Sequence, residues 1–119
     1  MEYLGEHGYA AVIHDHRGHG KSVKRKEDLG YFYGGRDKGI VEDLHQVTCW
    51  IKEHFPGVPV YMLGHSMGSL AARVYLKDYD RELKKLILTG PPSANPAADL
   101  GLFLAVLQKK LRGGRFRSK

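Results

Sequence analysis

Apolar residues recur at steps of three and four in the middle of the chain, which predicts an amphipathic helix from Lys38 to Phe55. Pro56 and Gly57 follow directly and are typical of a helix end. The predicted stripe consists of Val41, Leu44, Thr48, Ile51 and Phe55. A helix with one apolar face must bury it against another element, so we expect this face to cover a sheet.

Three short apolar runs predict buried β-strands at residues 9–14, 58–63 and 83–89. Helices are predicted for residues 67–78, between the second and third runs, and for the apolar segment 100–107. Strands that alternate with helices form parallel sheets. The pattern therefore indicates an α/β fold with a mostly parallel sheet of about three strands and flanking helices.

The pentapeptide Gly64-His65-Ser66-Met67-Gly68 stands where a predicted strand passes into a predicted helix. A G-x-S-x-G sequence in that position is typical of a nucleophile elbow, in which the serine projects from a sharp turn. We expect glycines on both sides because side chains there would collide with neighbouring backbone. A glycine-rich turn with an incidental serine is the alternative, and the strand and helix around it make it the weaker one. Ser66 is thus a candidate nucleophile for acyl transfer to water.

Length and charge bound the function further. The 119 residues suffice for one small domain, and 42% hydrophobic residues are ordinary for a globular protein. The formal net charge is +6, but all of the excess lies in residues 109–119. A neutral body with a short basic end gives no reason to expect a nucleic-acid partner.

The chain reads as cytoplasmic. It has no charge-free apolar stretch of the roughly 20 residues that span a bilayer, and it starts with acidic residues rather than a secretory signal. The single cysteine, Cys49, lies within the predicted helix beside Trp50 and Ile51, so we expect a buried, unreactive thiol.

Three segments together resemble one branch of a known superfamily. They are the run from Val12 to Ser22, which contains Asp15-His16-Arg17-Gly18-His19-Gly20, the run from Gly64 to Ser69, and the run from Leu86 to Pro92. In this combination the chain resembles the monoacylglycerol lipase and lysophospholipase branch of the α/β-hydrolases, whose bacterial members are often called serine aminopeptidase-like. The resemblance covers nearly the whole chain. It implies a partial α/β-hydrolase domain over residues 1–119, with a core at 1–92 and the start of a cap at 93–119.

The resemblance also implies roles for individual residues. Ser66 matches the nucleophile, and the backbone N–H of Met67 matches an oxyanion-hole donor at a helix N-terminus. Gly64, His65 and Gly68 complete the elbow, and His65 is not implied to be the general base. Asp15 and Arg17 belong to the turn of residues 15–20 and are expected to hold loops by charge-assisted hydrogen bonds.

Several parts that the resemblance implies are not in these 119 residues: an earlier strand with a His-Gly loop, which supplies the second oxyanion donor, and the acid and histidine of the triad. We therefore expect an internal fragment of the fold, with a gap in its sheet between the strands at 9–14 and 59–64. His14 and His16 are the histidines expected on the same rim as Ser66. A makeshift triad with them is disfavoured, because a base must lie within hydrogen-bond reach and be oriented by a third group.

No metal and no cofactor are expected. His14, His16 and His19 offer three imidazoles in a tight glycine turn without a nearby cysteine, so solvated or hydrogen-bonded histidines are the simpler interpretation. Gly20-Lys21-Ser22 resembles the end of a phosphate-binding loop, but Asp15 stands where that loop requires glycine.

The function predicted is a serine hydrolase of carboxylic esters that works through an acyl-enzyme on Ser66 and takes a small acyl-ester or lipid substrate. A truncated fragment with only binding or structural capacity is the alternative. The segment Leu100–Leu107 and the basic residues after it suggest weak contact with a membrane surface, although burial against the rest of a cap is the favoured interpretation. The sequence predicts neither the preferred ester nor the oligomeric state.

Overall fold

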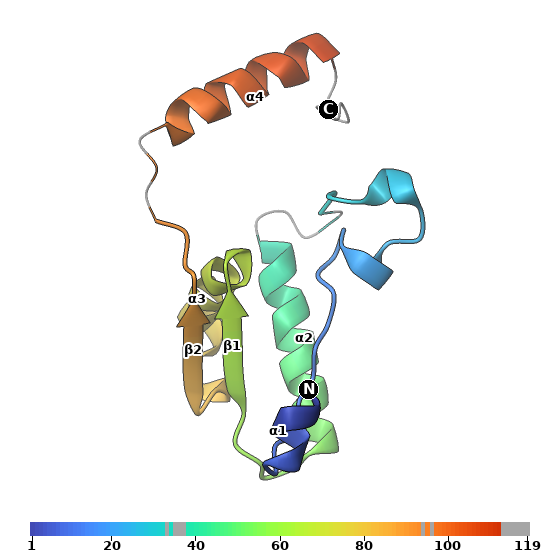
Figure 1. The fold of residues 1–119 in the computed structure, drawn as a ribbon, viewed down its shortest axis with the longest axis vertical. Coiled ribbons are helices and arrows are strands. Elements are labelled where there is room, and N and C mark those ends of the chain that lie inside the picture. Colours follow the sequence, from blue (N-terminus) through green and yellow to red (C-terminus); the bar gives the residue numbers. More distant parts are fainter. Residues whose placement is uncertain (33, 35–37, 94, 96, 113–119) are drawn as a thin grey trace.

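A computed structural model describes residues 1–32, 34, 38–93, 95 and 97–112. Its elements run in chain order from the short helix α1 (Glu2–Glu6) to the isolated helix α4 (Ala98–Arg112), as Figure 1 shows. Between them lie the 3₁₀ turns η1 (Gly20–Ser22) and η2 (Lys26–Asp28), the helix α2 (Gly39–His54), the strand β1 (Tyr61–His65), the helix α3 (Met67–Tyr79), the 3₁₀ turn η4 (Asp80–Glu82) and the strand β2 (Lys85–Thr89).

The strands β1 and β2 pair in parallel, with Tyr61 opposite Lys85 and His65 opposite Thr89. The helix α3 connects them, so the three elements form a β-α-β unit, and the predicted α/β class is confirmed. One face of this sheet is packed and the other is open. Gly64 is buried, whereas Leu63, which points the other way, is 65% exposed.

The core lies between α2 and α3. Val41 and Leu44 of α2 pack with Tyr75 of α3, which has no exposed surface. Thr48 is also buried, and its hydroxyl donates a hydrogen bond of 2.9 Å to the carbonyl of Leu44. The predicted helix is therefore confirmed, and the first three positions of its apolar stripe are buried. They pack chiefly against α3 and not, as expected, against the sheet, from which Met62 of β1 contributes a partly buried side chain. Phe55, at the end of the stripe, is 36% exposed.

The strand predicted at residues 9–14 is not formed. These residues have no regular secondary structure, and among the described residues no backbone–backbone hydrogen bond involves residues 10–15. The apolar side chains there are open to solvent, with Ile13 74% exposed. A strand needs a neighbouring strand to satisfy its backbone groups, and β1 pairs only with β2 in the described part of the chain. The apolar run therefore lacks a partner, and the sheet has two strands rather than three.

The prediction of a buried thiol at Cys49 was also wrong, because Cys49 is exposed. The buried positions of α2 are Gly39, Val41, Leu44 and Thr48, and Cys49 lies on the flank of that stripe. Trp50 beside it is 47% exposed.

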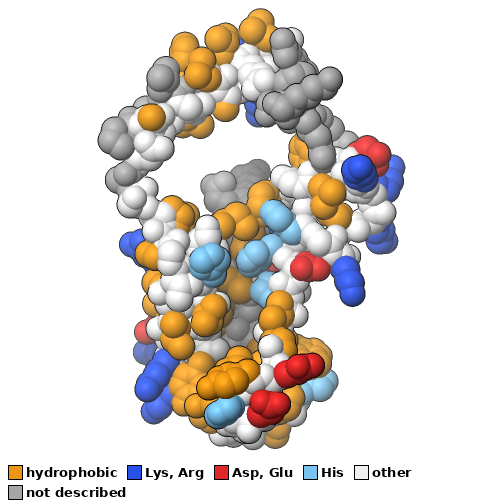
Figure 2. Space-filling view, in the orientation of Figure 1, with side chains coloured by type: hydrophobic (Ala, Val, Ile, Leu, Met, Phe, Trp, Pro, Cys, Tyr) orange, Lys and Arg blue, Asp and Glu red, His pale blue; other side chains and the backbone are white. Residues whose placement is uncertain are grey.

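The helix predicted at residues 100–107 is formed and is longer than expected, as α4. Figure 2 shows apolar side chains along its outer surface, and Leu102 and Phe103 are 66% and 64% exposed. Of the helices in the described ranges, none combines the length and the apolarity that crossing a bilayer requires.

Candidate active site

Ser66 occupies the junction between β1 and α3 with a strained backbone. Its φ is +51° and its ψ is −118°, and it is the one non-glycine residue with positive φ in the described ranges. Such a conformation costs about 1–3 kcal/mol and persists only where surrounding contacts enforce it. A strained serine between a strand and a helix is the geometry of a nucleophile elbow.

Hydrogen bonds on both sides hold this turn. The N–H of Ser66 donates to the carbonyl of Thr89 at the end of β2, at 3.0 Å. The carbonyl of Ser66 accepts from both the N–H and the hydroxyl of Ser69, at 2.9 and 2.6 Å. Ser69 is fully buried, and His65 Nδ1 lies 2.9 Å from Thr89 Oγ1. The backbone of Ser66 is thus fixed by α3 on one side and by β2 on the other.

The two glycines of the pentapeptide differ in the space around them. A Cβ at Gly64 would lie 2.7 Å from the carbonyl oxygen of Gly68 and 3.0 Å from the Cα of Ser69. A Cβ at Gly68 would meet no atom within 4 Å. The crowding that we expected on both sides of Ser66 is therefore present at Gly64 and absent at Gly68.

Met67 is the first residue of α3, directly after the serine. The first N–H groups of a helix have no intrahelical acceptor, and no described residue accepts a hydrogen bond from the Met67 N–H. Ser66 and Met67 are both exposed residues. A developing negative charge there would also gain from the helix dipole.

His14 and His16, which were expected on the same rim of the sheet as Ser66, make no hydrogen bond to this serine in the described structure. The rings of His14 and His16 meet edge to face, with centroids 4.9 Å apart. Their atoms His14 Nε2 and His16 Nδ1 are buried without a hydrogen-bond partner. Burial and the neighbouring His14 and His19 lower the pKa of His16. In the portion of the chain that the structure describes, no group hydrogen-bonds to Ser66 Oγ, so no general base is in place.

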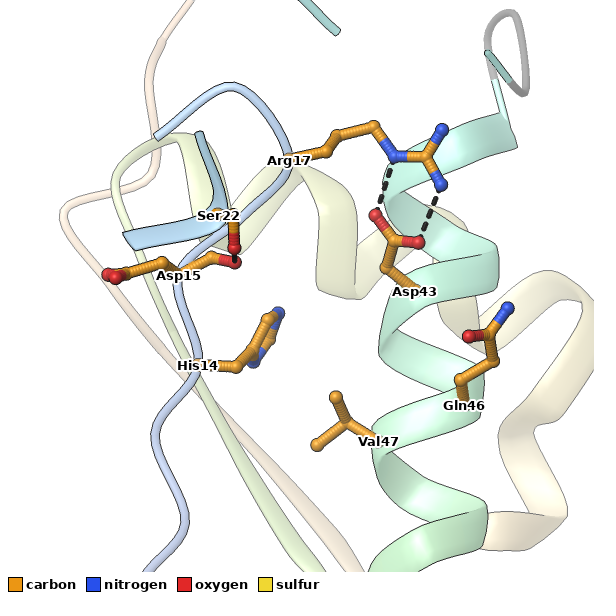
Figure 3. Close-up of a pocket in the computed structure, with 7 residues that line it drawn as sticks. All are labelled: His14, Asp15, Arg17, Ser22, Asp43, Gln46 and Val47. Atoms are coloured by element: carbon orange, nitrogen blue, oxygen red, sulfur yellow. Dashed lines mark hydrogen bonds and ion pairs between the residues drawn. The ribbon is translucent and has the colours of Figure 1, made fainter. Parts of the chain in front are cut away.

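The turn after His14 is held by charged side chains, as predicted (Figure 3). Arg17 donates to both carboxylate oxygens of Asp43 on α2, at 2.6 and 2.5 Å, and these bonds hold the pKa of Asp43 below its usual range. Asp15 accepts from the N–H of Lys21 at 2.8 Å, and its carbonyl accepts from the hydroxyl of Ser22 at 2.7 Å. These contacts fasten the turn to itself and to α2, which is a structural role.

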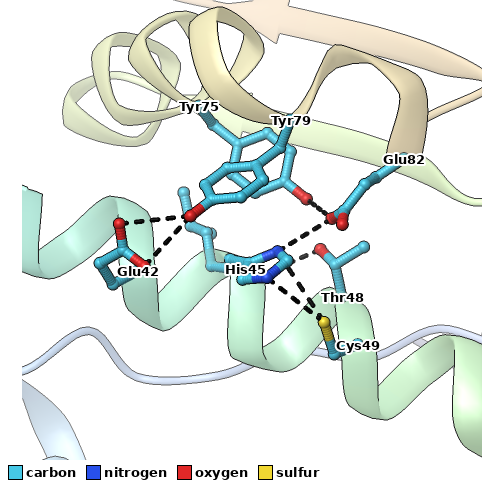
Figure 4. A network of polar contacts seen from close by, with 8 residues as sticks. Glu42, His45, Thr48, Cys49, Tyr75, Tyr79 and Glu82 are labelled. Carbon is cyan, nitrogen blue, oxygen red and sulfur yellow. Dashed lines mark hydrogen bonds and ion pairs between the residues drawn. The ribbon is translucent and has the colours of Figure 1, made fainter.

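A second polar cluster, which the sequence analysis did not anticipate, joins α2 to η4 (Figure 4). His45 Nδ1 lies 3.2 Å from Glu82 Oε2, and Cys49 Sγ lies 3.6 Å from His45 Nε2. The hydroxyl of Tyr75 donates to Glu82, and the ring of Tyr79 stacks on His45 at 4.0 Å. The spacing of His45 and Cys49, one helical turn apart, was the available signal for half of this cluster.

Comparison with known proteins gives a consistent family. The model of the family described as serine aminopeptidase, S33, matches residues 1–116. The chain is 34% identical to the monoglyceride lipase homologue of monkeypox virus over 110 residues, which are 89% of this chain and 37% of the viral protein. It is 33% identical to the monoglyceride lipase of Rattus norvegicus over 99 residues, which are 82% of this chain and 30% of the rat enzyme.

A bacterial relative agrees with these two. The probable lysophospholipase L2 of Haemophilus influenzae is 32% identical over 87 residues, which are 71% of this chain and 26% of that protein. The chain therefore spans about a quarter to two fifths of the length of the three relatives. No solved structure matches it.

Proposed function

This chain belongs to the serine aminopeptidase S33 family of α/β-hydrolases, and from this premise we propose that it carries the nucleophile of a serine hydrolase of carboxylic esters. The observation that carries the proposal is the strained backbone of Ser66 at the junction of β1 and α3. That conformation has an energetic cost and is typical of a serine whose hydroxyl must project from the turn toward a substrate.

In the proposed reaction, Ser66 Oγ attacks the carbonyl carbon of an ester and its proton passes to a general base. The carbonyl electron pair moves onto the oxygen, which accepts a hydrogen bond from the Met67 N–H. Collapse of this intermediate expels the alcohol, which takes the proton from the base, and leaves an acyl-enzyme. Water then attacks the acyl carbon, and the carboxylic acid leaves Ser66 free again.

The substrate class that we propose is a lipid ester with a single acyl chain, either a monoacylglycerol or a lysophospholipid. The names of the relatives support both. The exposed apolar side chains of α4, among them Leu102 and Phe103, offer a surface of suitable chemistry for an acyl chain. We also retain the sequence-based prediction of a cytoplasmic location, which imaging of the tagged chain in cells would test.

A second candidate function is binding without catalysis. It is favoured by the observation that no group in the described residues is hydrogen-bonded to Ser66 Oγ, since a serine without a base is a weak nucleophile at neutral pH. Under this alternative the elbow is retained as architecture, and the chain holds a ligand or a partner without turning it over.

Labelling with a fluorophosphonate probe, read by intact mass, separates the two. We expect slow labelling of the native chain, acceleration by added imidazole acting as an external base, and no labelling of Ser66→Ala or of heat-denatured chain. Ser69→Ala is not a suitable control because Ser69 holds the turn. Ser93→Ala is suitable, since this serine is exposed and lies outside the described helices and strands, and it should label like the parent chain. No labelling of folded chain, with or without imidazole, would overturn the nucleophile proposal.

A further inference from the structure

We propose that His45, Cys49 and Glu82 form a binding site for a zinc ion that links α2 to η4. The three side chains are the group of metal-ligating residue types that the described part of the chain brings together, with one candidate atom from each and all of these atoms within 4.8 Å of one another. Imidazole nitrogen, thiolate sulfur and carboxylate oxygen are the ligand types that zinc binds in proteins. The site is independent of Ser66 and of the proposed hydrolase.

The distances suit a tetrahedral ion with little movement. Zinc bonds of about 2.0–2.3 Å place neighbouring tetrahedral ligand atoms about 3.4–3.6 Å apart. His45 Nδ1 already lies 3.2 Å from Glu82 Oε2 and 3.8 Å from Cys49 Sγ. Nδ1 is therefore the His45 nitrogen that we assign to the metal, and the candidate ligand atoms of all three residues lie within 4.8 Å of one another.

The chemistry of the three groups fits a zinc site with one open position. Cys49 would lose its thiol proton to solvent and bind as thiolate, while neutral His45 donates a nitrogen lone pair and Glu82 binds as carboxylate. Three protein ligands leave the fourth position to water, as in open zinc sites. Cys49 is exposed, so an ion can reach the site from solvent.

Neighbouring side chains hold two of the ligands in place. The hydroxyl of the fully buried Tyr75 donates to the Glu82 carboxylate, and the ring of Tyr79 lies parallel to that of His45, with an interplanar angle of 8°. Figure 4 shows these rings between α2 and α3, with Glu82 beside them. Outer contacts of this kind orient metal ligands and raise affinity. Because Tyr75 belongs to the core, the ligand geometry depends on the most firmly packed part of the molecule.

This proposal revises the expectation that the chain holds no metal. That expectation considered only His14, His16 and His19, which lie close together in sequence. Two ligands of the proposed site are one helical turn apart on α2, and the third comes from a separate element 37 positions from His45. The histidine-rich turn and the proposed site can therefore be tested against each other.

The experiment is titration of the untagged chain with Co²⁺ and with Zn²⁺ in a chelator-free buffer containing a phosphine reductant. We expect one Co²⁺ per chain, a thiolate-to-cobalt charge-transfer band, loss of the band when Zn²⁺ is added, and an upward shift of the melting temperature with Zn²⁺. Cys49→Ser should abolish the band and weaken Zn²⁺ binding at least tenfold. Glu82→Gln should weaken it by a similar factor.

Two control variants make the result specific. His54→Gln removes an exposed histidine of the same helix, whose Nδ1 contacts the Trp50 carbonyl, and it should leave the band and the affinity unchanged. The double variant His14→Asn and His16→Asn should do the same. Far-ultraviolet circular dichroism of each variant establishes that it is folded before titration, and the exposure of Cys49 makes Cys49→Ser the mildest change. Absence of the charge-transfer band, unchanged Zn²⁺ affinity in folded Cys49→Ser, or a band that requires His14 and His16 would each overturn the proposal.

Discussion

Residues 39–89 and residues 9–32 contain similar apolar runs but acquire structure in different ways. In the first region, α2 and α3 bury Val41, Leu44 and Tyr75 together, and β1 pairs with β2. In the second, the backbone of residues 10–15 pairs with no described backbone group, and side-chain bonds of Asp15 and Arg17 hold the turn that follows. An apolar run therefore becomes a strand only where an adjacent strand is available to pair with it.

The largest expected difference between the regions comes from truncating one apolar side chain in each. Leu44→Ala should reduce the free energy of unfolding by about 3 kcal/mol because it leaves a cavity in the core. Ile13→Ala, at a side chain that is 74% exposed, should change it by less than about 0.5 kcal/mol. Urea denaturation followed by circular dichroism measures both values. Equal losses would mean that residues 9–14 are packed in solution.

Within the packed region, adding one methyl group at Gly64 and adding one at Gly68 should have opposite effects on the free energy of unfolding. Gly64→Ala should cost about 2 kcal/mol, because its Cβ would press on the backbone of Gly68. Gly68→Ala meets no atom and lies in a helix, so it should stabilise the chain by about 0.5–1 kcal/mol. Chemical denaturation of the two variants side by side tests this, and a loss at Gly68 as large as that at Gly64 would contradict the geometry of the turn.

The ion pair of Arg17 and Asp43 links the two regions, and its contribution to stability should depend on pH. Asp43→Asn should cost about 1 kcal/mol at neutral pH. The pKa of Asp43 is lowered in the folded chain, chiefly by the hydrogen bonds from Arg17, so its contribution is present above the ordinary carboxyl pKa. That contribution is lost as the pH falls from about 4 through the lowered folded value.

The measurement is the urea midpoint of the parent chain and of Asp43→Asn between neutral and acid pH. The difference between the two should shrink as the pH falls. Lys38 and Asp78 form a more exposed ion pair, with side chains 65% and 40% exposed, so Asp78→Asn is the matched control and should show a smaller effect. A difference that is constant with pH would show that the ion pair does not form.

The smallest expected effect concerns backbone strain. In residues 9–32 positive φ occurs only at the glycines Gly18, Gly20 and Gly30, whereas the packed region holds Ser66 at +51°. Ser66→Gly relieves the backbone strain, and this gain should exceed the entropy cost of the more flexible glycine by about 0.5 kcal/mol. Ser66→Ala keeps a Cβ and the strain, so it should not stabilise the chain. Thermal melts of the three chains measure this. Destabilisation by Ser66→Gly would contradict the relief of strain, and an equal loss in Ser66→Ala would mean that the serine side chain holds the turn.

The sequence was sufficient to predict the elements whose signals lie within a short stretch of chain. The helix α2, the β1-α3-β2 unit and the candidate nucleophile Ser66 follow from periodicity, from turn residues and from one pentapeptide. The secondary structure of residues 9–14 could not be predicted in the same way, because an apolar run carries no information on whether a neighbouring strand is available to pair with it.

The same limit applies to polar groups. The exposure of Cys49 and its proximity to Glu82 depend on how α2 packs against α3 and η4, which no spacing within one helix encodes. His14 and His16 were expected on the rim of Ser66 from their place at the end of a strand. Because that strand is not formed, the argument that put them there no longer applies.

The parallel register that sets His65 opposite Thr89 also bears on the order in which the chain folds. These two residues are separated by only 24 positions, so the loop that must close to join them is short and loses little conformational entropy. Among the described residues, the hydrogen bonds that fix the serine turn come from α3 and from β2, and none comes from a more distant segment. The part of the molecule that holds the candidate nucleophile is therefore encoded within a single stretch of chain, and we expect its assembly to be independent of residues 9–32 and of α4.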